Sequence, residues 1–561
     1  MNKLFRTVTF CLVTMALVLS ACAPTAAPAP APQPTTAPAV PTAAPAQQKP
    51  TEPPAAPPPT EPPAPAKPVD LEIWVGAAVS EAGPPPDDWV AYQIIREKLN
   101  INLKVVLLPT AQTDQDAKIN AAGAANQLPD LIHINRTPWF KAYQAGLIAP
   151  VDDLLPLMPN RTKILYSDPI RRALVTLDGK MYGLPQPGQI LYTDGLVIRK
   201  DWLTKLGLEA PKTLDEFLTV AKAFTEKDPD GNGKADTYGY CGYIESEGLG
   251  VVPGLAKRFD WIYGAYGVAG TWNLTSAADF GLNARNPNFM KATEFIKSMI
   301  DAKVIDPDWP TLKKDEYRAR WKQGKCGIMN ENFAALSTKA NYADFDKNFP
   351  DGEWVVLTPP AGPDGKSSEG LSLTNVRIFA VSQAAMDAGK GEAIARLLEW
   401  MSSDEGYYLL GFGVEGVNYK KDAQGYITTE GIEPEKAYSH KSQQPLTQLR
   451  NMVFMNSDVE LHARYVKYKT ANGREMNPLS FLEAFSKQPW TEATGSAIVN
   501  PPPTGADFNR FYSEGLVKFV LGQEPLNTDT WAAFIAGLDG LGAKDWEAAT
   551  KQQLIDAGFL K

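Results

Sequence analysis

From Val69 onward, short apolar runs alternate with segments in which apolar residues recur every three or four positions. Runs of the first kind, such as 71–75 and 101–108, have the length and β-branched content of buried strands. Segments of the second kind, such as 87–99 and 391–401, place their apolar side chains on one face of a helix. This alternation predicts an α/β fold in which βαβ units surround a largely parallel sheet.

The stretch 178–239 carries the strongest local signals. Thr213 and Glu216 have the S/T-x-x-E spacing of a capping box, and an apolar helical face runs from Leu214 to Phe224. Further strands are expected at 130–134, 182–185, 195–199, 325–329, 354–358 and 371–381, and further helices at 117–125, 287–300 and 315–323.

The segment DPDGNGKAD, residues 228–236, has the spacing of a calcium-binding loop. Acidic or amide side chains stand at positions 1, 3, 5 and 9 of an EF-hand count, with Gly233 at the sharp turn. Gly239 replaces the usual bidentate Glu at position 12, so we do not expect a full helix–loop–helix sensor. We expect a structural Ca²⁺ held by Asp228, Asp230, Asn232, Lys234 (through its carbonyl) and Asp236, with a polar turn as the alternative.

The N-terminus has the pattern of a bacterial lipoprotein signal peptide. Lys3 and Arg6 precede an apolar stretch that is too short to span a bilayer, and the sequence Leu-Ser-Ala-Cys ends at Cys22. We expect cleavage after residue 21 and lipidation of Cys22, which would anchor the protein to the cell membrane on its outer side. An ordinary secretory peptide is the alternative. Residues 22–68, rich in Ala and Pro, predict a disordered tether.

Composition limits the classes of function. A chain of 561 residues can form two or more lobes, and a net charge of −9 without a Lys/Arg-rich run gives no support for nucleic-acid binding. Two cysteines remain in the expected folded part, Cys241 and Cys326. A disulfide is permitted in this compartment, and two buried thiols are equally compatible with the sequence.

Several phrases in order resemble a known family. LPDLI, DGKMYGLP, LVIRKDWLTKLGL, WKQGKCGIMNENF and LLEWMSSDEGYYLL resemble the extracellular solute-binding proteins of carbohydrate ABC importers, the maltodextrin-binding-like class. The DPDGNGKAD loop narrows the resemblance to a large subgroup with a calcium loop. The resemblance implies the two-lobed periplasmic-binding-protein type II fold, with a ligand cleft between lobes joined by three crossovers. It also implies a carbohydrate ligand, ABC permease transmembrane subunits as partners, and a monomer.

The resemblance also divides the folded part. Lobe 1 would comprise 69–188 and 376–413, and lobe 2 would comprise 189–375 and 414–561 with a C-terminal extension. The crossovers would lie near 186–194, 365–378 and 411–419.

A sugar site needs aromatic platforms for C–H faces and polar groups for paired hydroxyls. The aromatic candidates on expected cleft loops are Trp139, Tyr192, Trp261, Tyr263, Trp272 and Phe333. The polar candidates at strand ends or crossovers are Asn135, Arg136, Gln186, Asn332, Asn375, Arg377 and Asn418. For each aromatic residue, a place in the core is the alternative.

No motif indicates an enzyme, and we expect no catalytic residues. None of the three histidines falls in an HExxH arrangement, and the chain has neither a GxSxG elbow nor a P-loop. Two alternatives remain open: a lipid-anchored polysaccharide hydrolase that uses paired carboxylates, and a binding protein for a non-sugar solute such as a peptide.

Overall fold

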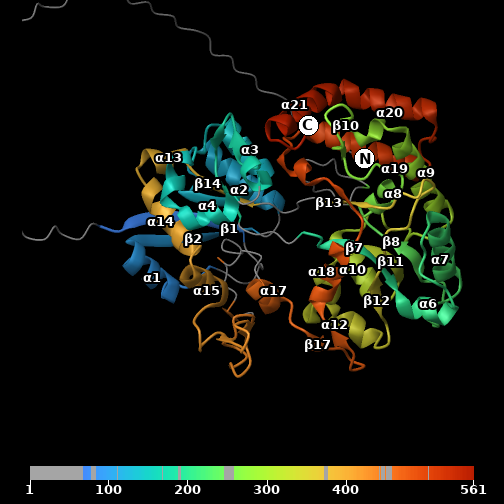
Figure 1. Ribbon diagram of the computed structural model, residues 1–561, viewed down its shortest axis with the longest axis horizontal. Helices are drawn as coiled ribbons and strands as arrows, with labels where there is room; N and C mark the ends of the chain where they lie inside the picture. The colour runs from blue at the N-terminus through green and yellow to red at the C-terminus, as the bar shows by residue number, and fades with distance from the viewer. Residues whose placement is uncertain are drawn as a thin grey trace, which may run out of the picture. The chain divides into compact units, whose positions relative to one another are not determined.

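The computed structural model describes residues 67–561 except 77–83, 110–111, 167–168, 187–190, 245–254, 256–257, 372–376, 441, 444–448, 450–457 and 503 (Figure 1). The predicted signal peptide, Cys22, most of the tether and Asn375 lie outside the described residues. Within these ranges no helix has the length and apolar character that a membrane span requires.

A five-stranded sheet forms the centre of the first lobe, in the order β2-β1-β3-β14-β6. Its strands are β1 (Val69–Gly76), β2 (Ile101–Leu108), β3 (Leu131–Asn135), β14 (Arg377–Val381) and β6 (Leu184–Pro185). β1 pairs in parallel with β2 and β3, as the alternation of strands with helices α1 (Val90–Leu99) and α2 (Gln112–Ala124) predicts. β14 returns late in the chain and pairs antiparallel with β3 and β6.

A four-stranded sheet forms the centre of the second lobe, in the order β12-β7-β11-β8. Its strands are β7 (Asp194–Arg199), β8 (Tyr238–Cys241), β11 (Cys326–Asn332) and β12 (Trp354–Val356). Only β8 and β11 pair in parallel, whereas β7 runs antiparallel to both β11 and β12. The expected largely parallel sheet is wrong for this lobe, because β7 enters from the first crossover rather than through a βαβ unit.

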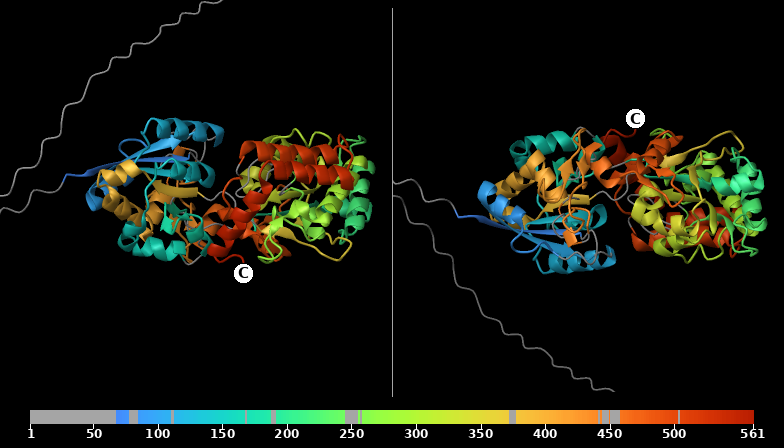
Figure 2. Two further views of the ribbon diagram at one scale, coloured as in Figure 1. Left: turned by 90° about the horizontal axis from the view of Figure 1, so that it is seen from above. Right: turned by 90° about the horizontal axis from the view of Figure 1, so that it is seen from below.

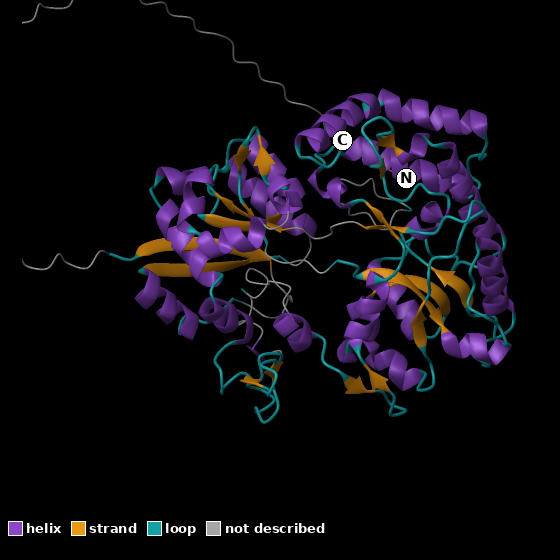
Figure 3. Cartoon of the chain, in the orientation of Figure 1, coloured by secondary structure: helices purple, strands orange, loops and turns teal. Residues whose placement is uncertain are grey.

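Helices lie around both sheets, as the purple and orange elements of Figure 3 show. The remaining helices are α3 (Arg136–Gln144), α4 (Pro159–Tyr166), α5 (Pro169–Ala173), α6 (Lys200–Leu206), α7 (Leu214–Glu226), α8 (Asp260–Ala265), α9 (Pro287–Asp301), α10 (Lys314–Lys322), α11 (Phe333–Ser337), α12 (Lys339–Asn348), α13 (Gln383–Asp387), α14 (Gly391–Met401), α15 (Asp404–Phe412), α17 (Asp458–Arg464), α18 (Pro478–Ser486), α19 (Ala506–Val520), α20 (Thr528–Gly540) and α21 (Ala543–Asp556). Short strands include β13 (Glu369–Leu371) and β19 (Trp490–Glu492), which pair with each other in parallel.

The predicted cap of α7 is present in part. The Thr213 hydroxyl accepts a hydrogen bond from the Glu216 amide at 3.2 Å. The Glu216 carboxylate accepts from the amide of Lys212, one residue before the expected donor. The apolar face that begins at Leu214 is buried, so one helix end and one apolar face were both readable from sequence.

The C-terminal region packs against the cores of both sheets. Tyr438 and Leu554 belong to the apolar cluster of the first sheet, whereas Phe485 and Trp546 belong to clusters of the second. Helices α19 to α21 are drawn in red in Figure 2, and α19 contacts α9. Residues 414–561, which the sequence prediction gave to the second lobe, therefore contribute to both cores.

A disulfide joins two neighbouring strands of the second sheet. Cys241 on β8 and Cys326 on β11 are bonded, and both are fully buried. Of the two states that the sequence left open, the structure has the bonded one.

Candidate functional site

The carboxyl ends of β1 and β3 form one polar edge. Gly76 ends β1 and Asn135 ends β3. Arg377, the first residue of β14, lies opposite Asn135 in the antiparallel register, and the Gln186 backbone N–H donates to the Arg377 carbonyl at 2.7 Å. Four distant segments thus meet where ligands of open α/β sheets bind.

This edge is electropositive. Burial lowers the pKa of Arg377 below its ordinary value. Burial also holds the pKa of His133 well below its usual range, and the positive charges of Arg377 and Arg161 lower it further. The His133 ring is stacked on Phe379, so neutral His133 serves as part of the sheet core.

The second lobe presents a polar pair at the ends of its strands. Asp194 begins β7 and Asn332 ends β11, and the Asn332 side-chain amide donates to the Asp194 carboxylate at 3.2 Å. The Asn332 oxygen also accepts from the Ala334 amide at 3.0 Å and so caps α11. The guanidinium of Arg258 lies 3.5 Å from the other Asp194 oxygen. Asp194 and Arg258 were not selected from sequence, because nothing local marks them.

Two buried carboxyl groups lie beside this pair. Glu369 accepts a hydrogen bond from the Asn330 side-chain amide, and Asp260 accepts from the amides of Gly270 and Gly370. Burial raises the pKa of Asp260. Burial also raises the pKa of Glu369 well above its ordinary value, and the neighbouring Asp260 raises it further. A carboxyl group that keeps its proton can donate a hydrogen bond to a neighbouring oxygen.

One aromatic pair is partly exposed. Tyr192 has a φ of 58°, and its ring centroid lies 5.5 Å from that of Trp490. Both side chains are half-buried. Tyr192 was a candidate from sequence, whereas Trp490 was missed because it lies on β19, far along the chain.

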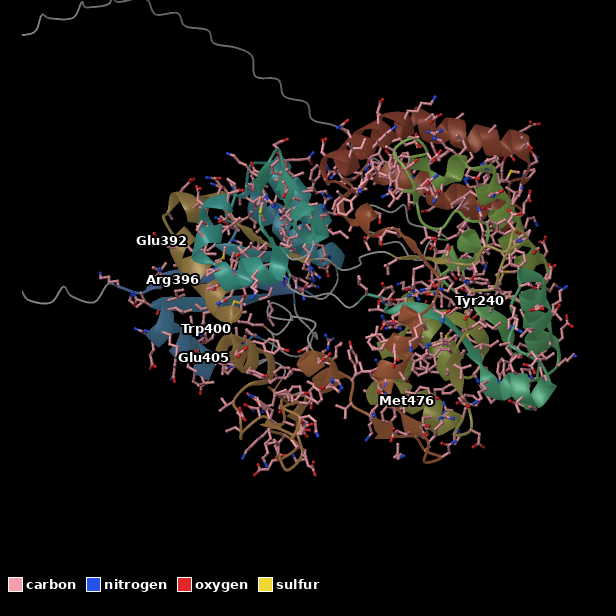
Figure 4. All side chains as sticks on the ribbon, in the orientation of Figure 1. Tyr240, Glu392, Arg396, Trp400, Glu405 and Met476 are labelled. Carbon is pink, nitrogen blue, oxygen red and sulfur yellow. A yellow bond between two sulfur atoms is a disulfide. The ribbon has the colours of Figure 1, made fainter. Side chains whose placement is uncertain are left out.

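The other aromatic candidates are core residues. Each has at most 3% of its surface exposed, and they are Trp139, Trp261, Tyr263, Trp272 and Phe333. The Trp139 indole donates to the Tyr182 carbonyl, and the Trp261 indole donates to the hydroxyl of Tyr240, which Figure 4 labels. These five residues are therefore core residues, which was the alternative stated for each aromatic candidate.

Two polar candidates hold backbone in place. Buried Arg136 donates to the carbonyls of Leu174 and Val499 and to the Asn500 side chain, and burial lowers its pKa to about 9. Asn418 is also buried, and its side chain accepts from the Val414 amide and donates to the Lys436 carbonyl. Arg136 thus ties the start of α3 to the C-terminal region, and Asn418 fixes the chain near the third expected crossover.

The loop 228–236 is wound around its own carboxylates. The Asp228 carboxylate accepts from the amides of Gly231, Asn232 and Gly233. A side-chain hydrogen bond with Asp230, together with these backbone contacts, lowers the pKa of Asp228, whereas burial and that hydrogen bond raise the pKa of Asp230. The Asn232 amide lies 2.7 Å from Asp230 and 3.1 Å from Asp236. Carboxylate oxygens of Asp230 and Asp236 thus surround the Asn232 NH₂ group. Oxygen ligands gathered in this way suit a hard cation such as Ca²⁺.

The end of this loop departs from an EF-hand for a packing reason. A Cβ at Gly239 would lie 2.3 Å from the Ala221 carbonyl oxygen on α7, so no glutamate fits there. The buried Thr237 hydroxyl donates to the Phe224 carbonyl and is not turned to the loop. Across the described residues, no three His, Cys, Asp or Glu side chains converge as a metal-binding group.

Comparison with known proteins gives a family match over residues 87–408, to the bacterial extracellular solute-binding protein family. The chain is 30% identical over 348 residues to the polygalacturonan/rhamnogalacturonan-binding protein YtcQ of Bacillus subtilis (strain 168), covering 60% of this chain and 64% of YtcQ. It is 31% identical over 296 residues to the fructooligosaccharide ABC transporter substrate-binding protein FusA of Streptococcus pneumoniae serotype 4 (strain ATCC BAA-334 / TIGR4), covering 48% and 49%. The matches thus span one half to two thirds of these relatives.

Solved structures share the fold over most of the chain. The structure of S. pneumoniae FusA in complex with kestose has a TM-score of 0.60 at 20% identity, covering 86% of this chain and 98% of FusA. The alginate-binding protein AlgQ2, solved without calcium ion, has a TM-score of 0.60 at 18% identity, covering 87% and 98%. The expected two-lobed α/β fold is confirmed.

Proposed function

Because the chain belongs to the bacterial extracellular solute-binding protein family, we propose that it captures an oligosaccharide outside the cytoplasm and delivers it to an ABC permease. The ligand would bind between the two lobes, which close on it. Closure would bring the Asn135–Arg377 edge of one lobe and the Asp194–Asn332 pair of the other to the same ligand. The partners are then a carbohydrate and the permease's transmembrane subunits.

The proposal rests on the family match, which covers elements of both sheets. Within these elements, polar residues gather at the strand ends of each sheet. An amide beside a carboxylate, as at Asn332 and Asp194, suits paired sugar hydroxyls. The half-buried Tyr192 and Trp490 rings supply the apolar surface that a sugar ring needs. Two relatives whose names state oligosaccharide or polysaccharide ligands support a carbohydrate over a peptide.

The binding test is a thermal-shift screen of the purified full chain against oligosaccharides, followed by titration calorimetry of each hit. We expect one glycan class to raise the melting temperature. Peptides that bind while all glycans fail would refute the carbohydrate assignment. Release of reducing ends from a polysaccharide panel would favour the alternative hydrolase, and binding without turnover favours a receptor.

A second part of the proposal concerns calcium. Asp228, Asp230, Asn232, the Lys234 carbonyl and Asp236 would hold a Ca²⁺ that fixes the end of α7 against β8. The oxygen donors and the winding of the chain support this assignment. Two solved structures of related fold also support it: an EF-hand mutant of FusA, and AlgQ2 described as being without calcium ion. The ion would brace the second lobe and take no part in binding sugar.

A third part concerns location. Lipidation at Cys22 would tether a monomeric receptor to the outer side of the cell membrane, at the end of the Ala/Pro-rich segment. A B. subtilis relative called lipoprotein LipO, 26% identical over 368 residues, supports this location. Mass spectrometry of the membrane-extracted protein tests it, because a diacylated N-terminal peptide should begin at Cys22.

A further inference from the structure

Arg377 stands out at the carboxyl edge of the first sheet because no carboxylate of the described residues pairs with its guanidinium. No hydrogen bond or ion pair joins its guanidinium to another residue within the described ranges. Its Nη1 lies so close to Gly76 that a Cβ built there would be 2.3 Å away. Gly76 therefore makes room for the guanidinium at the end of β1.

The neighbouring groups add to this positive charge. The charges of Arg377 and Arg161 both depress the pKa of His133, so both act on the same part of the sheet. Arg171 donates to the Gln186 backbone carbonyl, and the Gln186 backbone N–H donates to the Arg377 carbonyl. The hydrogen bonds of the adjacent Arg136 go to uncharged oxygens.

Other shielded arginines of this chain have partners for their guanidinium groups. Four of them, in the second lobe, face carboxylates: Arg199 with Asp201, Arg285 with Asp539, Arg318 with Glu331 and Arg320 with Asp306. Buried Arg136 faces no carboxylate, but its donors reach carbonyl and amide oxygens. Leaving a shielded guanidinium without an anion costs free energy. In a chain with 64 acidic residues a partner would be easy to supply. The lack of an anion at Arg377 among the described residues therefore points to a ligand that brings its own.

We propose that Arg377 binds a carboxylate of the captured glycan, so that the ligand is an acidic oligosaccharide containing uronic acid residues. This inference rests on the proposed function. The planar guanidinium fork matches the two oxygens of a carboxylate, and the nearby amide groups of Asn135 and Gln186 suit the sugar's hydroxyls. Arg377 is thus the residue that selects acidic over neutral glycans.

The test uses titration calorimetry on the full chain with oligogalacturonates, oligomannuronates and oligosaccharides bearing glucuronate. Each is paired with its methyl ester, which removes the charge and keeps the shape, and neutral fructo- and malto-oligosaccharides complete the panel. We expect one uronate series to bind, with its ester roughly 10- to 100-fold weaker, the range of a charged hydrogen-bonded pair.

Two variants locate the effect. Arg377→Gln should bind the acid no better than the ester, and Gly76→Ala, which pushes the guanidinium aside, should reduce the preference for the acid while keeping the charge. Arg396→Gln is the matched control, because Arg396 is exposed on α14 and labelled in Figure 4. It should bind as wild type does. Melting temperatures show whether each variant is folded.

The outcomes separate this inference from the proposed function. Equal binding of acid and ester, or tight binding of neutral glycans alone, would overturn the acidic ligand and leave a sugar receptor. Equal loss of acid and ester binding in Arg377→Gln would also overturn the carboxylate contact. Failure of every glycan in the panel to bind would overturn the proposed function itself.

Discussion

Breaking the Cys241–Cys326 disulfide should destabilise the second lobe by several kcal/mol. The bond joins residues 85 positions apart in the sequence. Closing a loop of that length restricts the unfolded chain enough to contribute about 4.6 kcal/mol at 25 °C in the chain-entropy treatment. Both cysteines are fully buried, so reduction changes few contacts with solvent in the folded state. The expected fall in melting temperature is roughly 4–7 °C, because a unit of several hundred residues has a large unfolding entropy.

The assay compares wild-type protein refolded with and without reductant, with urea unfolding followed by tryptophan fluorescence. Trp321 and Trp354 share an apolar cluster with both cysteines and report on this lobe. The double variant Cys241→Ala/Cys326→Ala is the control: it should be less stable and should not respond to reductant. Oxidised and reduced wild type unfolding within about 1 kcal/mol of each other would refute the loop-closure argument.

Three further predictions concern the core, the buried carboxyl groups and the metal loop. Trp261→Ala should cost about 3–5 kcal/mol of unfolding free energy, measured in urea, because the indole is fully buried. Glu369→Gln should gain stability relative to wild type as the pH rises, measured as melting temperature. In the folded protein, burial raises the pKa of Glu369 well above its ordinary value of 4.5, so its carboxyl group keeps the proton to a higher pH. Stability from the protonated form is fully present below about pH 4.5 and is lost as the pH rises through the folded-state pKa. EDTA should lower the melting temperature of wild type, and Asp230→Asn should remove most of that response.

Each of these has a contrary result. Weakened glycan binding by a fully stable Trp261→Ala would place that ring in the binding site. A pH-independent difference between Glu369→Gln and wild type would mean that the carboxyl group does not change its protonation on folding. An EDTA response that survives in Asp230→Asn would put the metal elsewhere.

Local sequence signals located most elements near the first sheet. β2 runs from Ile101 to Leu108 and α14 from Gly391 to Met401, the ranges that periodicity gave. Thr213, the predicted cap of α7, accepts a hydrogen bond from the Glu216 amide. These predictions hold because an apolar run, an amphipathic period and a cap are properties of neighbouring residues.

The candidate site was only partly accessible in this way. Loop position made Trp139 and Trp261 good candidates, yet both fill cores, because an aromatic side chain is equally suited to a core and to a sugar. Trp490 was missed although its ring lies beside Tyr192. Trp490 lies on β19, which is placed by its pairing with β13, and no local pattern in the sequence shows that pairing.

The sequence alone determined the α/β class, the family, the calcium-type loop and the two cysteines available for a bond, since each depends on residue order over a short range. Only the tertiary structure decided which of two possible cysteine states exists, which aromatics are core, and that Gly239 must lack a side chain beside Ala221. It also set the Arg377 guanidinium over Gly76. Burial and charge pairing depend on which distant segments the fold brings together, and no stretch of sequence holds that information by itself.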